Sequence, residues 1–476
     1  MRFIGNVEKD AQVRAVASGA LSNGDAVVVN SNGTVGVVDP NAASVPQSIG
    51  TPVEFESGTS YYQRAAFDAA NNKVVITYRD VNNSNYSTVI VGDVSGSSIT
   101  FGTPVIIVSF EPAGPMPVVY DSSNEKIVIF YNNTSYQPTA TVATVSGTSI
   151  SLGSAVAFDT SVFIYNQASA AYDSVNGKVV TAYRRNGSDS SAIVGTVSGT
   201  SISFGSPSSF YSGSANDSAM GYDSSAGKVV IAFKEGNSGL GVLTGTVSGT
   251  SISFGSRTTI TSNVATACGV NYVSNANKTV VTYTDAEATD RGKAVVGTIS
   301  GTSISFGTIV TFGDANTFAS VSTPVASNTV SIAYPDRDNS NYGTFIVGTV
   351  SGTSISFNTK TAFNSANSNN FWGSAYDSNS KRAVFAYNDG SGKGVVAQPA
   401  HSGSNSESFI GFANGAYANA ASAVINTTCS VDRNQSGLTA GQTYYVQTDG
   451  SLGTTADDPS VVAGTAISST EIIVKG

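Results

Sequence analysis

One seven-residue string recurs along the chain at nearly constant spacing, and it limits the possible folds more than any other feature. VSGTSIS occurs at Val145–Ser151, Val197–Ser203, Val247–Ser253 and Val350–Ser356, with variants at Val94–Thr100 and Ile299–Ser305. Successive copies begin 51, 52, 50, 52 and 51 residues apart. Such a period indicates one structural unit that is used many times.

A second string precedes each copy and brings the number of units to seven. It reads AFDAANNKVVITY from Ala66, VYDSSNEKIVIFY from Val119, AYDSVNGKVVTAY from Ala171, GYDSSAGKVVIAF from Gly221 and AYDSNSKRAVFAY from Ala375, with looser versions from Asn271 and Pro324. Each unit contains four short runs rich in Val, Ile, Tyr and Phe, separated by turns, which is the pattern of four β-strands.

Four antiparallel strands in about 50 residues form one blade of a β-propeller. A β-solenoid would have shorter repeats, and a row of sandwich domains would need about twice the length per unit. We therefore expect an all-β chain whose residues 48–400 form a seven-bladed β-propeller.

The two ends of the repeat region predict how the ring closes. The seventh unit runs through Val395–Val396 but lacks its SGTSISFG strand. Ser48–Phe55 (SIGTPVEF) precedes the first unit and matches the missing piece, as in Ser98–Val105 (SITFGTPV). We expect Ser48–Phe55 to complete the last blade, because this pairing leaves no open strand edge.

The chain ends resemble each other. Residues 19–38 align without gaps with residues 436–455, and residues 413–432 fit the same frame more weakly. Each segment is predicted to be a hairpin, with turns at Asn32-Gly33 and Asp449-Gly450. Since closure brings both ends of the propeller to one blade, we expect a small β-domain built from residues 1–40 and 403–476, with a last strand in 471–476.

The C-terminal stretch carries a family resemblance. It reads SFIGFA from Ser408, GLTAGQTYYV from Gly437, DGSL from Asp449 and PSVVAGTAISSTEIIV from Pro459. It resembles a short β-module near the ends of virion proteins of tailed bacteriophages, especially tail fibres and head-decorating proteins of marine phages. The resemblance implies a virion component and supplies no active-site residue. It implies other virion proteins as partners of the end-domain, and we consider a homotrimer.

Composition and charge exclude several functional classes. Charged residues are 12% and the net charge is −9, without basic blocks, so we expect no nucleic-acid or anionic-membrane partner. The start, MRFIGNVEKD, has no apolar signal region, and no run of about 18 apolar residues predicts a membrane span. The two cysteines, Cys268 and Cys429, support neither a disulfide framework nor a metal site. A polar chain without a secretion signal is consistent with a virion surface location after host lysis.

Catalytic motifs are scarce. The one histidine, His401, lies in a Gly/Ser-rich linker, and neither a Ser-His-Asp triad nor a histidine metal site can be built around it. Five aspartates recur at one place in their units and are predicted to cap turns: Asp68, Asp121, Asp173, Asp223 and Asp377. The loops that begin at Asp80 and Asp336 are predicted to be tight polar turns rather than calcium sites. We expect no enzyme activity, no metal and no cofactor.

The two faces of the predicted propeller differ. The Asp-Ser-x-x-x-Lys and Ser-Gly-Thr-Ser turns share one face and hardly change, whereas the opposite face carries variable loops with many aromatic residues. They are Tyr61, Tyr62, Tyr86, Tyr136, Phe163, Tyr165, Tyr211, Phe318, Tyr342, Phe371 and Trp372. Variable loops on a rigid scaffold often form binding sites, although loops also drift where nothing constrains them. Tyr62, Tyr165 and Trp372 are the candidate ligand-binding residues.

These observations leave three functional hypotheses. The first is a non-enzymatic virion protein, as on a tail fibre, whose propeller attaches to a host-surface glycan or protein. The second is a head fibre or capsid-decorating protein. The third, from another class, is a polysaccharide-degrading propeller that uses unrepeated acids, namely Glu111, Asp217, Asp285, Glu287 and Asp314.

Overall fold

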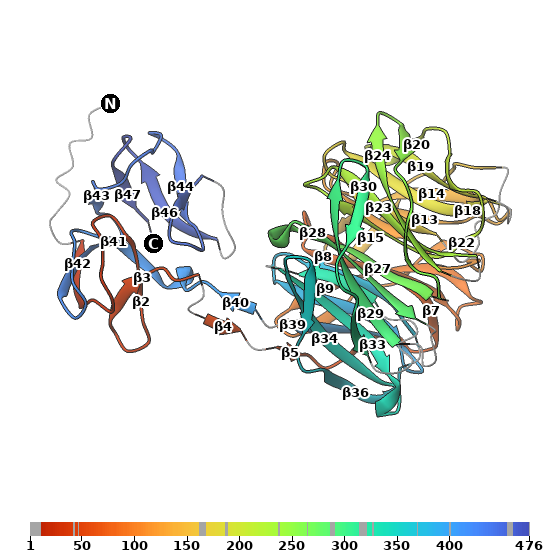
Figure 1. Ribbon diagram of the computed structural model, residues 1–476, viewed down its shortest axis with the longest axis horizontal. Coiled ribbons are helices and arrows are strands. Elements are labelled where there is room, and N and C mark those ends of the chain that lie inside the picture. Colours follow the sequence, from red (N-terminus) through yellow and green to blue (C-terminus); the bar gives the residue numbers. More distant parts are fainter. Residues whose placement is uncertain are drawn as a thin grey trace. The chain divides into compact units, whose positions relative to one another are not determined.

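The protein folds into two compact units, which are described separately. The computed structural model describes residues 11–40, 43–45, 47–160, 168–185, 189–236, 239–263, 265–285, 291–313, 321–325, 328–368, 370–398, 401–454 and 460–475. Residues 47–399 form one unit, and residues 1–46 together with 400–476 form the other (Figure 1).

Seven sheets with one common strand order make up the first unit. Blade 1 contains β7 (Ser60–Asp68), β8 (Lys73–Asp80), β9 (Tyr86–Ser95), β10 (Ser98–Phe101) and β11 (Val105–Val108). Blade 2 contains β12 (Val118–Asp121), β13 (Lys126–Asn132), β14 (Pro138–Ser146), β15 (Ser149–Leu152) and β16 (Val156–Ala157). Blade 3 contains β17 (Ser169–Asp173), β18 (Lys178–Arg185), β19 (Asp189–Ser198), β20 (Ser201–Phe204) and β21 (Ser208–Tyr211).

The remaining blades repeat this order. Blade 4 contains β22 (Ala215–Asp223), β23 (Lys228–Glu235), β24 (Leu240–Ser248), β25 (Ser251–Phe254) and β26 (Thr258–Thr261). Blade 5 contains β27 (Ala265–Val273), the 3₁₀ turn η1 (Ser274–Ala276), β28 (Lys278–Asp285), β29 (Arg291–Ser300), β30 (Ser303–Phe306) and β31 (Val310–Gly313). Blade 6 contains β32 (Val321–Val325), β33 (Thr329–Asp336), η2 (Arg337–Asn339), β34 (Tyr342–Ser351), β35 (Ser354–Phe357) and β36 (Thr361–Asn367). Blade 7 contains β37 (Asn370–Asp377), β38 (Arg382–Asn388), β39 (Gly392–Gln398) and two strands from earlier in the chain, β5 (Ser48–Ile49) and β6 (Val53–Glu56).

The fourth strand of each blade is broken into two segments, where the sequence predicts one run. In blade 1 both β10 and β11 pair antiparallel with β9, and the other blades follow the same pattern. The break falls at Gly102 in blade 1, whose backbone nitrogen still donates to the carbonyl of Val91. The outer strand therefore bends without leaving the sheet.

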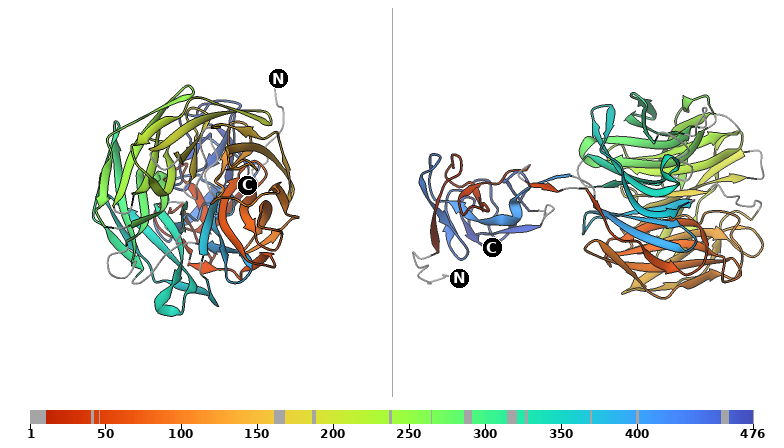
Figure 2. Two further views of the ribbon diagram at one scale, coloured as in Figure 1. Left: turned by 90° about the vertical axis from the view of Figure 1, so that its right-hand side faces the viewer. Right: turned by 90° about the horizontal axis from the view of Figure 1, so that it is seen from below.

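The ring is closed as the sequence predicts. Ile49 pairs with Ala397, and Val53 pairs with Gly394, so β5 and β6 supply the missing fourth strand of blade 7. The first strands of neighbouring blades contact one another around the ring, and β37 contacts β7. The blades follow one another in chain order in Figure 2, with the strands of blade 7 beside those of blade 1. The fold is thus a seven-bladed β-propeller.

The repeated turns have the structure that their residues require. In the Ser-Gly-Thr-Ser turns the glycine has a positive φ, as at Gly199 (φ 59°), and this conformation suits the first position of a two-residue hairpin loop. The recurring aspartates cap the other turn: Asp121 Oδ1 accepts from the backbone nitrogens of Ser123 and Asn124, at 3.0 and 3.1 Å. The prediction that these aspartates are structural is confirmed.

The second unit contains two five-stranded antiparallel sheets. Module 1 contains β1 (Gln12–Val16), β2 (Ala26–Val29), β3 (Val35–Val37), β41 (Phe409–Ala413) and β42 (Ser422–Asn426). Module 2 contains β43 (Val431–Asp432), β44 (Thr443–Val446), β45 (Leu452–Gly453), β46 (Val461–Ala466) and β47 (Ile472–Val474). The unit also contains β4 (Ala43–Val45), which pairs with β40 (His401–Gly403), and η3 (Ser406–Ser408).

The two modules are copies of one structure. The strand orders, β1-β42-β41-β2-β3 and β43-β47-β46-β44-β45, correspond strand for strand. A bulge lies at the same place in each, where Val27 and Tyr444 pair with Gly411 and Gly464. The predicted hairpins over 19–38 and 436–455 are therefore equivalent. The weaker third match over 413–432 is wrong, because β41 and β42 are the fourth and fifth strands of module 1 and not a third copy of the hairpin.

Candidate functional site

The variable face of the propeller carries a cluster of aromatic and charged side chains in blade 1. We call Tyr61, Tyr62, Arg79 and Glu111 the first tyrosine–arginine cluster. Tyr61 and Tyr62 begin β7, Arg79 is close to the end of β8, and Glu111 follows β11. The start of a first strand and the ends of a second and a fourth strand meet at one end of a meander, so all four residues lie on the same face.

The geometry of this cluster is defined by Arg79. Its guanidinium carbon lies 4.7 Å from the ring centre of Tyr61 and 5.2 Å from that of Tyr62. Its Nη1 donates to Glu111 Oε1 at 2.8 Å. Both tyrosines are half-buried and Glu111 is exposed. The rings lie 6.5 Å apart at 52°. A cation held over two rings and bound to a carboxylate is a stable arrangement that leaves polar atoms near an aromatic surface.

A β-bulge in β7 sets the direction of the Tyr61 and Tyr62 side chains. The pairing of β7 with β8 shifts between Tyr61 and Arg64, so the two residues Tyr62 and Gln63 stand opposite the single residue Tyr78. Tyr62 has φ 59°, a conformation that is unusual for a bulky residue. Gln63 is fully buried and its Nε2 donates to the hydroxyl of Ser60 at 2.7 Å. Bulges of this kind re-aim side chains and are frequent beside functional sites.

Two more aromatic residues extend the cluster toward blade 2. Phe110 precedes Glu111, and its ring meets that of Tyr136 edge-on, with centres 4.8 Å apart. Tyr136 lies in the turn between β13 and β14 with φ 61° and is 49% exposed. Aromatic surface is thus present on both blades around the exposed carboxylate.

The same three residue types meet again between blades 3 and 4. Arg257, which precedes β26, lies 5.3 Å from the ring centre of Tyr211 at the end of β21. Its Nε is 3.1 Å from Glu235 Oε1. We call these three residues the second tyrosine–arginine cluster.

The structure brings two of the three predicted ligand-binding residues into corresponding places. Tyr62 lies in the bulge of β7, and Trp372 is the extra residue of a bulge in β37, between Phe371 and Gly373. These strands belong to neighbouring blades in contact. The side chain of Trp372 and the whole of Tyr165 lie outside the described residues. Arg79 was missed in the sequence, where it follows the repeated aromatic residue near the end of the second strand and has one arginine counterpart, Arg184 of blade 3.

The inner strands carry a second charged feature. Burial lowers the pKa of the Arg64 guanidinium to about 10, and the negative charge of Asp217 opposes this shift. Arg64 is on β7 of blade 1 and Asp217 is on β22 of blade 4. Asp217 lies in another bulge and has φ 45°. The two charges belong to first strands that are not neighbours in the ring.

At one repeated position on the variable face, the acid that ends the second strand of a blade forms an ion pair with a lysine. Asp285 ends β28 and lies 2.6 Å from Lys293 Nζ, and Asp336 ends β33 and lies 2.7 Å from Lys360 Nζ. Asp285 was grouped with the unrepeated acids in the sequence, but the structure shows that it is repeated. The ion pair at Asp336 and the backbone bond from Asn83 to Asp80 Oδ1 fit polar turns.

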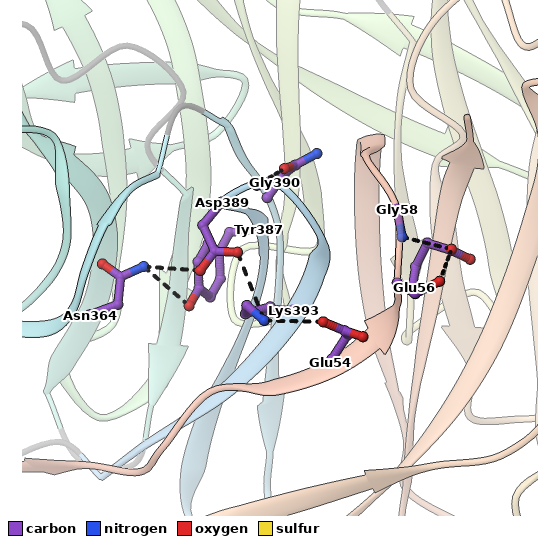
Figure 3. A network of polar contacts seen from close by, with 10 residues as sticks. Glu54, Glu56, Gly58, Asn364, Tyr387, Asp389, Gly390 and Lys393 are labelled. Atoms are coloured by element: carbon purple, nitrogen blue, oxygen red, sulfur yellow. Dashed lines mark hydrogen bonds and ion pairs between the residues drawn. The ribbon is translucent and has the colours of Figure 1, made fainter. Parts of the chain in front are cut away.

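Blade 7 shows the most extended version of this arrangement (Figure 3). Lys393 Nζ lies 3.4 Å from Glu54 Oε2 and 3.9 Å from Asp389 Oδ1. Asn364 Nδ2 donates to the hydroxyl of Tyr387 and to Asp389 Oδ2, each at 3.4 Å. Since Glu54 is on β6 and Asn364 is on β36, this network ties the closing strand to blades 6 and 7. Its place in the repeat favours a structural role.

The described part of the chain offers neither a metal-binding cluster nor a membrane-spanning helix. No group of three or more His, Cys, Asp or Glu side chains there could hold a metal ion. Among the same residues no helix is both long and apolar enough to cross a bilayer. His401 lies on β40 opposite Val45.

Comparisons with known proteins identify the fold. No family model and no curated protein sequence matches the chain. The BP39L lectin from Burkholderia pseudomallei matches with a TM-score of 0.56 at 11% identity, over 72% of this chain and 98% of that one. The Aleuria aurantia lectin matches with a TM-score of 0.40 at 13% identity, over 65% and 98%. The NanB sialidase from Streptococcus pneumoniae matches with a TM-score of 0.45 at 11% identity, over 74% and 71%. The similarity to BP39L supports the propeller fold and does not identify a ligand.

Proposed function

We propose that the propeller is a non-enzymatic carbohydrate-binding module whose ligand lies on the first tyrosine–arginine cluster, and that the protein displays it on the surface of a virion. The observation that carries the binding proposal is the contact of Arg79 with both Tyr61 and Tyr62 and with the exposed Glu111. The three residue types supply an aromatic surface, a donor and an acceptor within one site.

A sugar-binding site needs an aromatic surface, a donor and an acceptor close together. One face of a pyranose ring presents C–H groups that pack on an aromatic ring, while its hydroxyls both donate and accept hydrogen bonds. Arg79 supplies N–H donors in a fixed planar fork, and Glu111 supplies acceptors. Most binding sites likewise join an apolar surface to a few fixed polar groups.

The fold and the second cluster support the same proposal. The BP39L protein, which shares the propeller fold, is described as a lectin. The second tyrosine–arginine cluster repeats the Tyr, Arg and Glu set in other blades. Two such sites on one rigid scaffold would bind a multivalent glycan surface more strongly than either site alone.

The virion location rests on the resemblance of residues 408–474 to the terminal β-module of tailed-phage proteins. A tail fibre is the location that best suits a glycan-binding propeller, because a tail fibre attaches the virion to the host surface. A head fibre or capsid-decorating protein is the alternative, in which the end unit docks on the shell. Immunogold labelling of intact particles distinguishes the two.

The binding proposal is tested by measuring glycan affinity. Purified protein is screened on a bacterial polysaccharide array, and the best ligand is titrated against wild type, Arg79→Ala and Glu111→Gln. Loss of a charge-assisted hydrogen bond costs about 1.5–3 kcal/mol, so we expect each variant to weaken binding by about tenfold or more. Arg257→Ala, alone and combined with Arg79→Ala, measures the second cluster.

A matched control is available on the opposite face. Lys73→Ala removes a 3.0 Å ion pair with Asp93 beside the invariant turns and should leave the affinity unchanged. Equal affinity in the Arg79 variant and the control, with both proteins folded, would reject this site. Release of oligosaccharides from the bound polysaccharide would instead favour a degrading enzyme.

A further inference from the structure

The two modules of the end unit contact each other through unlike faces. In module 1 we define the inner face as the side that carries Val27 and Val29 and the outer face as the side that carries Ala26 and Val28. Ala26, Val28, Phe409 and Phe412 on the outer face of module 1 form one core with a set of residues from module 2. That set is Leu438, Tyr444, Val446, Ala463, Ala466, Ile472 and Val474.

The equivalence of the modules identifies which face module 2 contributes. Tyr444 corresponds to Val27, because both pair with the bulge glycine of their sheet. Val446 therefore corresponds to Val29, and both belong to the inner face. The outer face of module 1 thus packs on the inner face of module 2. This contact is head-to-tail, because it joins unlike faces of the two modules. The inner face of module 1 instead holds a core within that module, which contains Leu21, Val27 and Ile425.

Beside this core, the inner face of module 1 has an exposed apolar part. Val29 is 42% exposed there, whereas its counterpart Val446 is fully buried in the core that the two modules share. Val13 is directly opposite Ile425 on the same face and is also 42% exposed. Ile410 is half-buried, while its counterpart Ala463 is fully buried.

The outer face of module 2 has an exposed apolar part as well. Val462 is 37% exposed, whereas its counterpart Phe409 is 8% exposed. Ile473 is 38% exposed, and Tyr445, which is opposite Val462, is half-buried. The exposed apolar residues on each of these two faces therefore correspond to residues that are covered in the other module.

We propose that a second copy of this chain docks the outer face of its module 2 on the inner face of module 1, and so repeats between chains the contact that exists within each chain. Burial of the exposed valine and isoleucine side chains drives this association. Because the two faces differ, the contact is heterologous. It closes into a ring when the rotation permits and otherwise continues as a filament. A closed ring of three chains would give a homotrimer.

The experiment measures the mass of the full-length chain and of variants altered on one face. Val29→Lys disables the inner face of module 1, and the double variant Val462→Glu/Ile473→Lys disables the outer face of module 2. We expect wild type to assemble and each variant alone to be monomeric in sedimentation and light scattering. Val175→Lys changes a valine that is 66% exposed on the propeller and should assemble like wild type.

Mixing the two variants gives the decisive result. Each keeps one working face, so a head-to-tail contact predicts a complex of one chain of each variant that grows no further. A contact between two identical faces would give no such mixed pair, since each variant has lost a different face. The proposal is wrong if wild type stays monomeric up to its solubility limit. It is also wrong if the folded variants assemble like wild type, or if the mixture contains only single chains.

Discussion

A glycine at the bend of the fourth strand marks where neighbouring blades touch. A Cβ atom on Gly205 would lie 1.9 Å from the carbonyl oxygen of Thr250, in the Ser-Gly-Thr-Ser turn of the next blade. Equivalent glycines meet the next turn in the same way at 1.7–2.4 Å. Blade 6 has Asn358 at this position, where its backbone nitrogen donates to Val347 as the glycines do in their blades. Blade 7 has no such turn, because β39 ends at Gln398 and β5 begins anew at Ser48. The asparagine in blade 6 therefore follows from the way in which β5 closes the ring.

Substitution at these two positions should give opposite outcomes. Gly205→Ala places a methyl group against a backbone carbonyl that cannot move independently of its turn, and such overpacking costs about 1–3 kcal/mol. Asn358→Ala shortens an exposed side chain and should change stability little. Urea unfolding of both variants measures the difference. Equal stability of the two would show that blade contacts at the bend are loose.

Residue roles were predictable from the sequence where they repeat. Asp121 and its counterparts recur in five units, and repetition identifies a structural role without coordinates. Glu111 does not repeat, Arg79 has an arginine counterpart only in blade 3 (Arg184), and Arg79 and Glu111 are 32 residues apart in the chain. Only the sheet of blade 1 brings them together, since Arg79 is on β8, Glu111 follows β11, and both strands pair with β9. A single sequence holds no signal for such a pair.

The closing strand β6 contributes as much to blade 7 as its counterparts do elsewhere. Phe55 is buried and its ring lies 5.1 Å from Tyr78 and 5.4 Å from Phe101. Ile49 and Val53 also pack against buried residues. The contacts of Phe55 and Val53 join blade 7 to blade 1, and those of Ile49 lie between blades 6 and 7. The strands β5 and β6 therefore close the ring both by backbone pairing and by side-chain packing.

Replacing Ser48–Phe55 with a Gly/Ser segment of equal length should open the ring. The exchange keeps the chain length but removes the buried side chains, and loss of Phe55 alone would cost about 3–5 kcal/mol. We expect a lower melting temperature and association through the exposed edge of β39. Differential scanning calorimetry and light scattering measure both effects. A variant that melts like wild type and stays equally dispersed would contradict closure by these residues.

Among the strands, those of the propeller were predicted well from the sequence, and those of the end unit only in part. Seven copies of one pattern identify each strand through its counterparts. In the end unit β1 pairs with β42, across more than 400 residues, and the residues of β1 match no repeated pattern in the chain. The partner of β1 therefore could not be predicted from local pattern.

The whole molecule is organised as an insertion. Module 2 is continuous from β43 to β47, whereas module 1 is interrupted between its third strand, β3, and its fourth, β41. The propeller occupies this interruption, which corresponds to the connection between β45 and β46 in module 2. A closed propeller suits such a position, because its first and last strands are adjacent and return the chain close to where it left.

The propeller also carries a ring of buried tyrosines that makes it sensitive to high pH. Burial, aided in most blades by nearby carboxylates, raises the pKa values of Tyr78, Tyr131, Tyr183, Tyr283 and Tyr387. Unfolded tyrosine ionises near pH 10. Above that pH the unfolded chain binds fewer protons than the native one, so stability that is complete below pH 10 falls as the pH rises. The slope is about 1.4 kcal/mol per pH unit for each such tyrosine.

Tyr283→Phe tests this dependence with little disturbance at neutral pH. The Tyr283 hydroxyl is buried and has no hydrogen-bond partner among the described residues, and blade 4 already has Phe233 at the equivalent position. We therefore expect wild type and variant to be about equally stable at pH 7, within about 1 kcal/mol. Above pH 10 the variant should lose stability less steeply and unfold at a higher pH. Absorbance at 295 nm reports phenolate formation, and circular dichroism reports unfolding in the same samples. If both proteins unfold at the same pH, or if the variant loses stability as steeply as wild type above pH 10, the buried tyrosines do not control alkaline unfolding.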